Sequence, residues 1–317
     1  MKRTSKSEAA MFLVAAVVLV AFGAWTVWKD AQRMQPSGGG VGLFGYIDPT
    51  GAMVIAPQFE LAYDFSGGLA AVRVGSRTGF IDKSGTVVIA AQYDDAGEFN
   101  EGMAAVLMSG KLGYIDTTGM MAIAPVFDRA GPFSEGLAPV ATEGKYGYVD
   151  KAGDMAIPAR FRHALPFTEG LAAVVLDEQC GYIDKAGDFA IPPEFAHGGQ
   201  FANGLARVCV DDEWGYIDRT GQWVIPPQFE DAGEFSEDLS PVEVDGRWGF
   251  VDASGNMAFP PQFEKARGFS NGLAVVQVNG RQGYIDRQGA FVVPAVYLNA
   301  YPFREGLARV RIAPGRP

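Results

Sequence analysis

Aspartates recur at a fixed spacing along most of the chain, and they are the first residues whose chemistry needs an explanation. Eight of them are 34 residues apart: Asp48, Asp82, Asp116, Asp150, Asp184, Asp218, Asp252 and Asp286. A calcium site needs six or more oxygen ligands, and the Gly-Gly-x-Gly-x-Asp nonapeptide of calcium-binding β-rolls is absent. Each aspartate stands three residues before a glycine, as Asp218 does before Gly221, and a type I turn favours this pair. We therefore expect turns here, without a bound metal or other cofactor.

The two histidines and two cysteines are the remaining candidates for metal binding or catalysis. His163 and His197 occupy the same repeat position one unit apart, which could bring them together, but no motif supplies a third ligand. The other six copies of this position hold Leu61, Asp95, Arg129, Asp231, Lys265 and Asn299, as expected of a variable, exposed position. Cys180 and Cys209 lie at different repeat positions, so inert packing is favoured over a disulfide.

Catalytic residues of repeat proteins usually lie on loops that interrupt the repeat. No insertion interrupts this one, and the chain has no nucleophile elbow, phosphate-binding loop or metal-ligand motif. Glu194, Glu213 and Asp238 are the only carboxylates that we can nominate for a composite site across units. The sequence therefore predicts no catalytic, cofactor-binding or metal-binding residue, and an enzyme is the less favoured alternative.

Glycine and aromatic ladders define the repeat, which has 34 residues and occurs eight times. The first glycine ladder is Gly45, Gly79, Gly113, Gly147, Gly181, Gly215, Gly249 and Gly283. Two aromatic ladders include Phe229 and Phe235, which we expect to pack between neighbouring units. Helical tetratricopeptide repeats share this period, but glycine and proline would cost about 1 and 3 kcal/mol per residue inside a helix. The units are therefore expected to be β-structure.

Alternating apolar residues place a strand at residues 205–210 of the clearest unit. Two further strands are expected at 214–217 and 222–225, with a turn between them. The segment 226–238 then crosses to the next unit. A lone three-stranded meander cannot close a core, so its stability must come from the stacking of units.

The unit resembles the WG-repeat family, also called the WG β repeat. The namesake pair stands here as Trp214-Gly215 and Trp248-Gly249, and Tyr216, Ile217 and Asp218 follow the first pair in the family's order. Elsewhere the tryptophan position holds Phe44, Thr78, Leu112, Tyr146, Cys180 and Gln282. The resemblance covers residues 44 to about 310 and implies a repeat scaffold, mostly bacterial, with no known reaction. The signature residues, expected to be structural, are Trp214, Gly215, Trp248, Gly249, Phe229, Phe235, Asp218 and Gly221.

The expected fold class is all-β, with eight tandem three-stranded repeats. The series begins with a second strand at Phe44 and ends with a first strand at 307–312. This offset would let the last strand complete the first unit in a closed, propeller-like ring. The variable copy number expected of the family instead favours an open curved solenoid, which we predict, with the closed ring as the alternative.

The N-terminus contains an uncharged run of twenty residues that matches the thickness of a bilayer when helical. Tryptophans at its end suit a membrane interface, and the preceding lysines and arginine favour a cytoplasmic N-terminus. The expected organisation is a cytoplasmic tail at 1–8, a transmembrane signal-anchor helix at 9–28, a linker at 29–43 and a repeat array at 44–317, outside the cytoplasm and periplasmic if the cell is Gram-negative. The alternative is a signal peptide cleaved before Ala24, which would release a secreted array.

Charge limits the range of partners. Beyond residue 40 the chain carries 21 basic and 35 acidic residues, a balance of −14. Such a surface repels phosphate backbones and anionic headgroups, so we expect no nucleic-acid partner and membrane contact only through residues 9–28. The predicted function is that of a scaffold whose variable positions bind a protein or a cell-envelope polymer. An enzyme with a composite site and a passive spacer are the alternatives.

Overall fold

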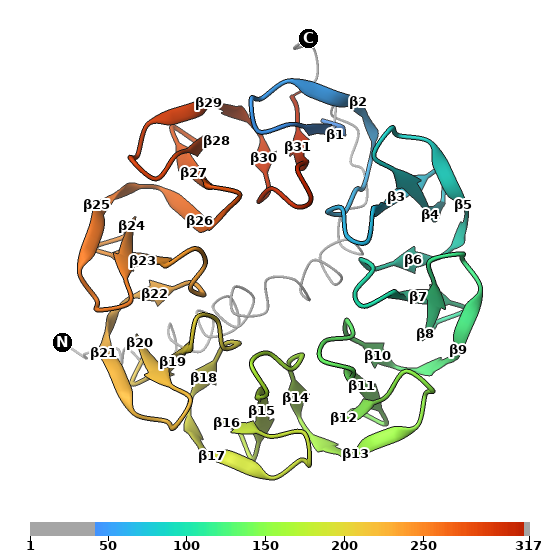
Figure 1. Cartoon of the computed structure of the whole chain (residues 1–317), viewed down its shortest axis with the longest axis horizontal. Coiled ribbons are helices and arrows are strands. Elements are labelled where there is room, and N and C mark those ends of the chain that lie inside the picture. The colour runs from blue at the N-terminus through green and yellow to red at the C-terminus, as the bar shows by residue number, and fades with distance from the viewer. Residues whose placement is uncertain (1–41, 314–317) are drawn as a thin grey trace, which may run out of the picture. The chain divides into compact units, whose positions relative to one another are not determined.

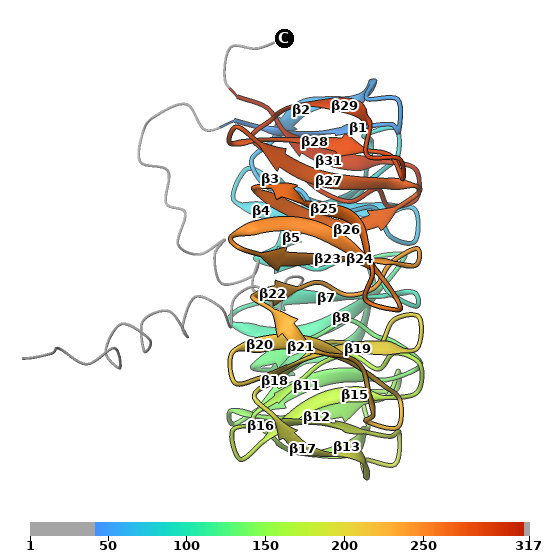
Figure 2. The ribbon, with the colours of Figure 1, turned by 90° about the vertical axis from the view of Figure 1, so that its left-hand side faces the viewer.

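The computed structural model describes residues 42–313, and in this part of the chain eight small sheets form a closed ring (Figure 1). Each sheet is one blade, and Figure 2 shows the ring edge-on. The predicted spanning segment, residues 9–28, lies outside the described residues. No helix within residues 42–313 is long and apolar enough to cross a membrane.

Blades 1 to 7 follow one another along the chain, with the sheets β3-β4-β5, β6-β7-β8-β9, β10-β11-β12-β13, β14-β15-β16-β17, β18-β19-β20-β21, β22-β23-β24-β25 and β26-β27-β28-β29. Blade 8 combines both ends of the described chain in the order β30-β31-β1-β2. In blade 1 an isolated bridge between Ala62 and Val72 replaces the innermost strand.

The innermost strands lie nearest the centre of the ring in Figure 1 and are β6 (Asp95–Ala96), β10 (Arg129–Ala130), β14 (His163–Ala164), β18 (His197–Gly198), β22 (Asp231–Ala232), β26 (Lys265–Ser270) and β30 (Asn299–Ala300). The second strands are β3 (Leu69–Val74), β7 (Met103–Met108), β11 (Ala138–Thr142), β15 (Ala172–Leu176), β19 (Leu205–Val210), β23 (Leu239–Val244), β27 (Leu273–Val278) and β31 (Ala308–Arg311).

The third strands are β1 (Phe44–Ile47), β4 (Arg77–Asp82), β8 (Lys111–Asp116), β12 (Lys145–Val149), β16 (Gln179–Ile183), β20 (Glu213–Asp218), β24 (Arg247–Asp252) and β28 (Arg281–Ile285). The outermost strands are β2 (Met53–Phe59), β5 (Val87–Tyr93), β9 (Met121–Phe127), β13 (Met155–Phe161), β17 (Phe189–Phe195), β21 (Trp223–Phe229), β25 (Met257–Phe263) and β29 (Phe291–Tyr297). All neighbouring strands within a blade run antiparallel.

The prediction of an open solenoid is wrong, because β31 pairs with β1 and closes the ring. Their register places Phe44 opposite Arg311 and Ile47 opposite Ala308. Contacts between blades 8 and 1 reinforce this seam, since the Glu305 carboxylate accepts a hydrogen bond from the Gly68 backbone N at 3.0 Å. The offset of the repeat, read above as compatible with closure, is what supplies the missing strands of blade 8.

The three strands predicted for each unit are present, and the structure extends them. Residues 226–229, assigned above to the crossing segment, continue strand β21. Pro226 and Pro227 fit there because β21 is an edge strand and its register with β20 shifts between Ile225 and Phe229, and edges and bulges are where a strand tolerates proline. The short strand β22 then adds the innermost strand of the next blade.

The hydrophobic core lies between neighbouring blades. One cluster, for example, joins Phe44 and Tyr46 of blade 8 to Phe65 and Val72 of blade 1. Six of the eight blades place a tyrosine at the position of Tyr216, and its hydroxyl donates to a backbone oxygen of the next blade at 2.7–3.0 Å. These contacts hold each blade against its neighbour, so the innermost strands are fixed around the centre of the ring.

Candidate binding site on the inner strands

The signature residues that the sequence singled out serve the packing and turns of the blades. Trp214 is buried opposite Phe229 across β20 and β21, while Trp248 is half-buried and stands opposite Phe263. Phe235 is buried, with its ring centroid 4.8 Å from that of Tyr216 in the preceding blade. These side chains therefore have structural roles.

Close backbone approach explains the first glycine ladder. A Cβ atom added at Gly215 would lie 2.5 Å from the backbone oxygen of Ile225, and one at Gly249 would lie 2.6 Å from that of Phe259. The register between the third and outermost strands shifts at this point, which brings the two backbones together. Only glycine fits such an approach, whatever residue precedes it.

The turn aspartates cap their own turns. Asp218 Oδ1 accepts hydrogen bonds from the backbone N of Thr220 at 2.8 Å and of Gln222 at 3.0 Å, and from the Thr220 hydroxyl at 2.7 Å. The Thr220 hydroxyl and these backbone donors hold the pKa of Asp218 below its usual range. Gly221 completes the turn with a φ of +85°, which favours glycine.

The histidines and cysteines do not form a shared site. His163 and His197 lie on the innermost strands of blades 4 and 5, half-buried against Tyr146 and Trp214 respectively. Within residues 42–313 no group of three histidine, cysteine, aspartate or glutamate side chains could hold a metal ion.

Cys180 and Cys209 are buried free thiols. Burial raises the pKa of Cys180 to about 12 and that of Cys209 to about 11, so neither thiol is a ready nucleophile. They pack within the blades, as the sequence favoured.

The three carboxylates nominated for a composite site stay apart. Glu194 is exposed on the outermost strand of blade 4, and Glu213 is exposed at the start of β20 in blade 5. Asp238 lies exposed in the turn before β23, at a φ of +70° where the seven other blades have glycine. The structure therefore gives no shared cleft for these residues.

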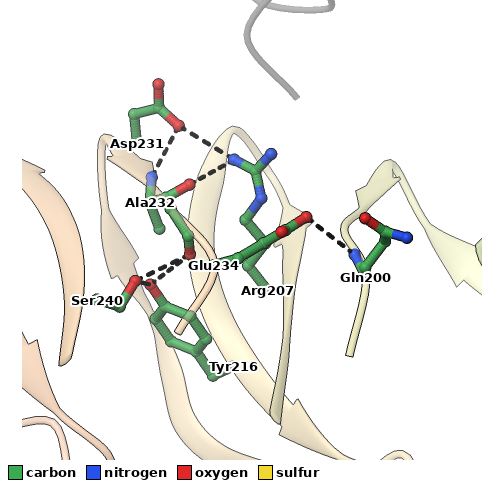
Figure 3. Close-up of polar contacts among 8 residues, drawn as sticks. Gln200, Arg207, Tyr216, Asp231, Ala232, Glu234 and Ser240 are labelled. Carbon is green, nitrogen blue, oxygen red and sulfur yellow. Dashed lines mark hydrogen bonds and ion pairs between the residues drawn. The ribbon is translucent and has the colours of Figure 1, made fainter. Parts of the chain in front are cut away.

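A polar cluster that sequence reasoning missed joins the inner ends of blades 5 and 6 (Figure 3). Arg207 of β19 is buried, donates through Nη1 to the backbone oxygen of Ala232, and lies 3.9 Å from Asp231 Oδ1. Its guanidinium carbon also lies 4.9 Å from the centre of the Trp214 ring. Burial raises the pKa of Asp231, while the charge of Arg207 opposes that rise.

A second cluster has the same design at the junction of blades 8 and 1. Arg309 of β31 occupies the repeat position of Arg207 and donates to the backbone oxygen of Ala62. Its Nε lies 2.7 Å from Asp64 Oδ1, and its guanidinium carbon lies 3.7 Å from the centre of the Tyr301 ring. Glu98, in blade 2, accepts a hydrogen bond from the Asp64 backbone N at 3.3 Å.

Burial raises the pKa of Glu98 to about 7, and the neighbouring carboxylate of Asp64 adds to this rise while Arg309 opposes it. The clusters thus place charged, hydrogen-bonding groups in the inner parts of two junctions, while the remaining junctions lack the arginine. The signal was present in the sequence, because the other six copies of this position hold Ala71, Ala105, Pro139, Ala173, Pro241 and Val275.

The position of His163 is the most variable on the innermost strands. This position was expected to be exposed in every copy, but its exposure differs between the blades. Asp95 is buried, His163 and His197 are half-buried, and Lys265 is exposed. The innermost strands of different blades therefore carry acidic, basic or imidazole side chains at this position.

A family model described as WG containing repeat matches the chain eight times, at residues 44–77, 79–111, 113–146, 146–180, 181–214, 214–248, 248–281 and 283–313. Comparison with curated proteins finds no match.

Two solved structures share the architecture. A eukaryotic initiation factor is similar with a TM-score of 0.55 and 13% identity, covering 82% of this chain and 87% of that chain. The dihydro-heme d1 dehydrogenase NirN in complex with DHE is similar with a TM-score of 0.54 and 10% identity, covering 88% of this chain and 75% of that chain. At these identities the likeness extends to the fold alone.

Proposed function

The chain belongs to the WG-repeat family, and we propose that it is a binding scaffold, without catalysis, for a protein or an envelope polymer. One observation carries this proposal: the repeats are constant where they hold the ring together and variable on the innermost strands. The glycine that permits close backbone approach is present in all eight copies, whereas the position of His163 holds six residue types. A rigid frame that presents different side chains at equivalent places is suited to recognising a partner through its surface.

The proposal places the ring outside the cytoplasm, tethered by residues 9–28. The support is the uncharged length of that segment and its terminal tryptophans. Cell fractionation should find the full-length chain with membranes. A soluble exported form that starts near Ala24 would contradict the anchor.

Crosslinking followed by affinity purification of the full chain tests the binding function. We expect a partner that is lost when Arg129 and His163, on the innermost strands, are both changed to alanine. The matched control changes Glu194 and Gln228, exposed on outermost strands, in the same way. Equal capture by both double variants would argue against binding on the inner strands, and no capture at all would favour a passive spacer.

An enzyme remains the second candidate because of Glu98 alone. A carboxyl group whose pKa is raised to about 7, next to a second carboxyl group on Asp64, has the pattern of an acid paired with a base. However, Asp64 is held by Arg309 and the Glu98 carboxylate by a backbone N–H, so both are occupied in maintaining the junction. We therefore assign this pair a structural role.

A further inference from the structure

Charge is distributed unevenly around the ring. Residues 265–313, which form blade 7 and the C-terminal half of blade 8, carry seven basic and two acidic side chains, a balance of +5. Residues 42–264 carry thirteen basic and 33 acidic side chains, a balance of −20. Two of the seven cations, Arg287 and Arg309, pair with carboxylates of other blades, but the sector stays basic and would attract a negatively charged group.

Blade 7 also departs from the repeat in its innermost strand. Among the described innermost strands, β26 has six residues and each of the others has two. The extra length reflects one added pairing, that of Phe269 with Ala274, because the pairing of Ser270 with Leu273 has an equivalent in other blades. It is the edge of its sheet, with β27 on one side only. Exposure alternates along its first four residues: Lys265 and Arg267 are exposed, while Ala266 and Gly268 are half-buried.

The two exposed cations on β26 form no close ion pair within the described part of the chain, although burial raises the pKa of the Glu243 carboxyl and the charge of Lys265 opposes that rise. Neither Lys265 nor Arg267 lies within 4.0 Å of a carboxylate oxygen there. Glu264, their neighbour in sequence, is engaged by the backbone N of Gly280 at 2.9 Å and by the Gln277 amide at 3.1 Å.

Arg267 is also oriented by its surroundings. Its guanidinium carbon lies 5.0 Å from the centre of the Tyr301 ring, in blade 8. Arg309 contacts the same ring, but Asp64 neutralises its charge at 2.7 Å. Arg267 is thus a cation held against an aromatic ring with its charge still available to a ligand.

From these observations we propose that β26 binds an extended, acidic peptide segment of a partner protein. This inference rests on the proposed binding function and names the chemistry of the ligand. Side chains at alternate positions of an extended peptide are spaced by roughly 7 Å, which is also the spacing of Lys265 and Arg267 along the strand. Their charges therefore suit carboxylates at positions i and i+2 of the ligand. Ser236 of blade 6 already donates to the backbone oxygen of Phe269, so the peptide would pair with backbone groups along the first part of β26, at residues 265–267.

A peptide suits this surface better than a long polyanion does. Nucleic acid or a continuous acidic glycan that extended beyond blades 7 and 8 would meet the acidic blades, which would repel it. A glycan also has no backbone amides with which to pair along the free edge of a strand. The ligand is therefore a short acidic segment.

Fluorescence anisotropy with the full chain in a non-ionic detergent tests the proposal. The probe is a fluorescein-labelled octapeptide of alternating glutamate and threonine. We expect saturable binding that weakens as salt is raised, and binding roughly tenfold weaker in Lys265→Ala/Arg267→Ala, because two ion pairs are lost. The matched control is Lys145→Ala/Arg247→Ala, which removes the same charge from exposed residues of blades 3 and 6 and should bind the peptide nearly as well as the wild type.

Four results would overturn the proposal. The first is no binding of the glutamate peptide by the wild type, and the second is equal weakening of binding in both double variants, which would mean unspecific attraction. The third is stronger competition by polygalacturonate than by the unlabelled peptide, with dependence on the same two cations, which would make the ligand a glycan. The fourth is capture of the crosslinked partners by Lys265→Ala/Arg267→Ala, in which case the scaffold function stands and this assignment of its ligand falls.

Discussion

Replacing Phe235 with alanine tests whether the blades act as one cooperative ring. Phe235 is 3% exposed and packs on Tyr216 of the preceding blade. Loss of a buried phenylalanine costs about 3 to 5 kcal/mol, a figure that includes the cavity left behind. The Tyr216 hydroxyl bonds the backbone oxygen of Gly233 at 3.0 Å, in the same segment, so this bond should weaken as well. We expect a loss near the upper end of that range.

The ring predicts how this loss is distributed. In an open array, damage stays in the units next to the change, because stability is a sum of unit and neighbour terms. In a closed ring, opening one junction also frees the blades from the constraint at the seam, where β31 meets β1. Protection of backbone amides should therefore fall in all eight blades of Phe235→Ala.

Hydrogen exchange measured by mass spectrometry on the full chain can separate the two cases. Phe291→Ala is the matched control, since Phe291 is 46% exposed and its removal should cost little. Loss of protection confined to blades 5 and 6 would refute the cooperative ring, even though the ring is closed. Unchanged protection would refute the burial argument for Phe235 itself.

Three further substitutions test contacts within a blade and at the junctions between blades. Gly215→Ala should lower the melting temperature sharply in thermal denaturation, because its Cβ would lie 2.5 Å from a backbone oxygen, whereas Gly97→Ala meets only an ordinary contact at 3.8 Å and should not. Since the pKa of Glu98 is raised in the fold, its stabilising effect is present below its unfolded pKa and is lost as pH rises through about 7. Glu98→Gln should therefore raise the melting temperature more at pH 8 than at pH 5, and an equal effect at both would contradict the shift. Arg309→Met should cost about 3 to 5 kcal/mol in denaturant unfolding by leaving Asp64 unpaired, and Asp64→Asn in the same chain should restore part of the loss.

The repeat unit was readable from the sequence because its local rules are strong. Glycines at fixed places and aspartate-capped turns predicted where strands begin and end, and alternation in residues 205–210 matches strand β19. The innermost strands were missed because two residues, such as Asp231 and Ala232, are too few to show a period. Closure depended on a pairing between residues 44 and 311, a contact that no local pattern specifies.

The inner polar clusters were harder to predict than the turns. Arg207 and Arg309 were visible as departures from small residues in other copies, but their partners lie in the next blade. Asp64 and Arg309 are far apart in sequence and meet only because the ring closes. Attention to carboxylates alone led instead to Glu194 and Glu213, which are exposed on separate strands.

The seam shares with an ordinary junction the hydrogen bond from a backbone glycine to a glutamate, and this has a consequence for chain topology. Glu305 accepts from the Gly68 backbone N at 3.0 Å, just as Glu101 accepts from that of Gly136 at 3.1 Å. Nothing in these two hydrogen bonds distinguishes blade 8, which contains both ends of the described part of the chain. A circular permutant that is reopened at the turn after β19 and joined across residues 42 and 313 should therefore build the same ring. The two ends can therefore be moved to another blade without loss of the fold. Their position in the ring is then free to evolve according to where the ring is attached.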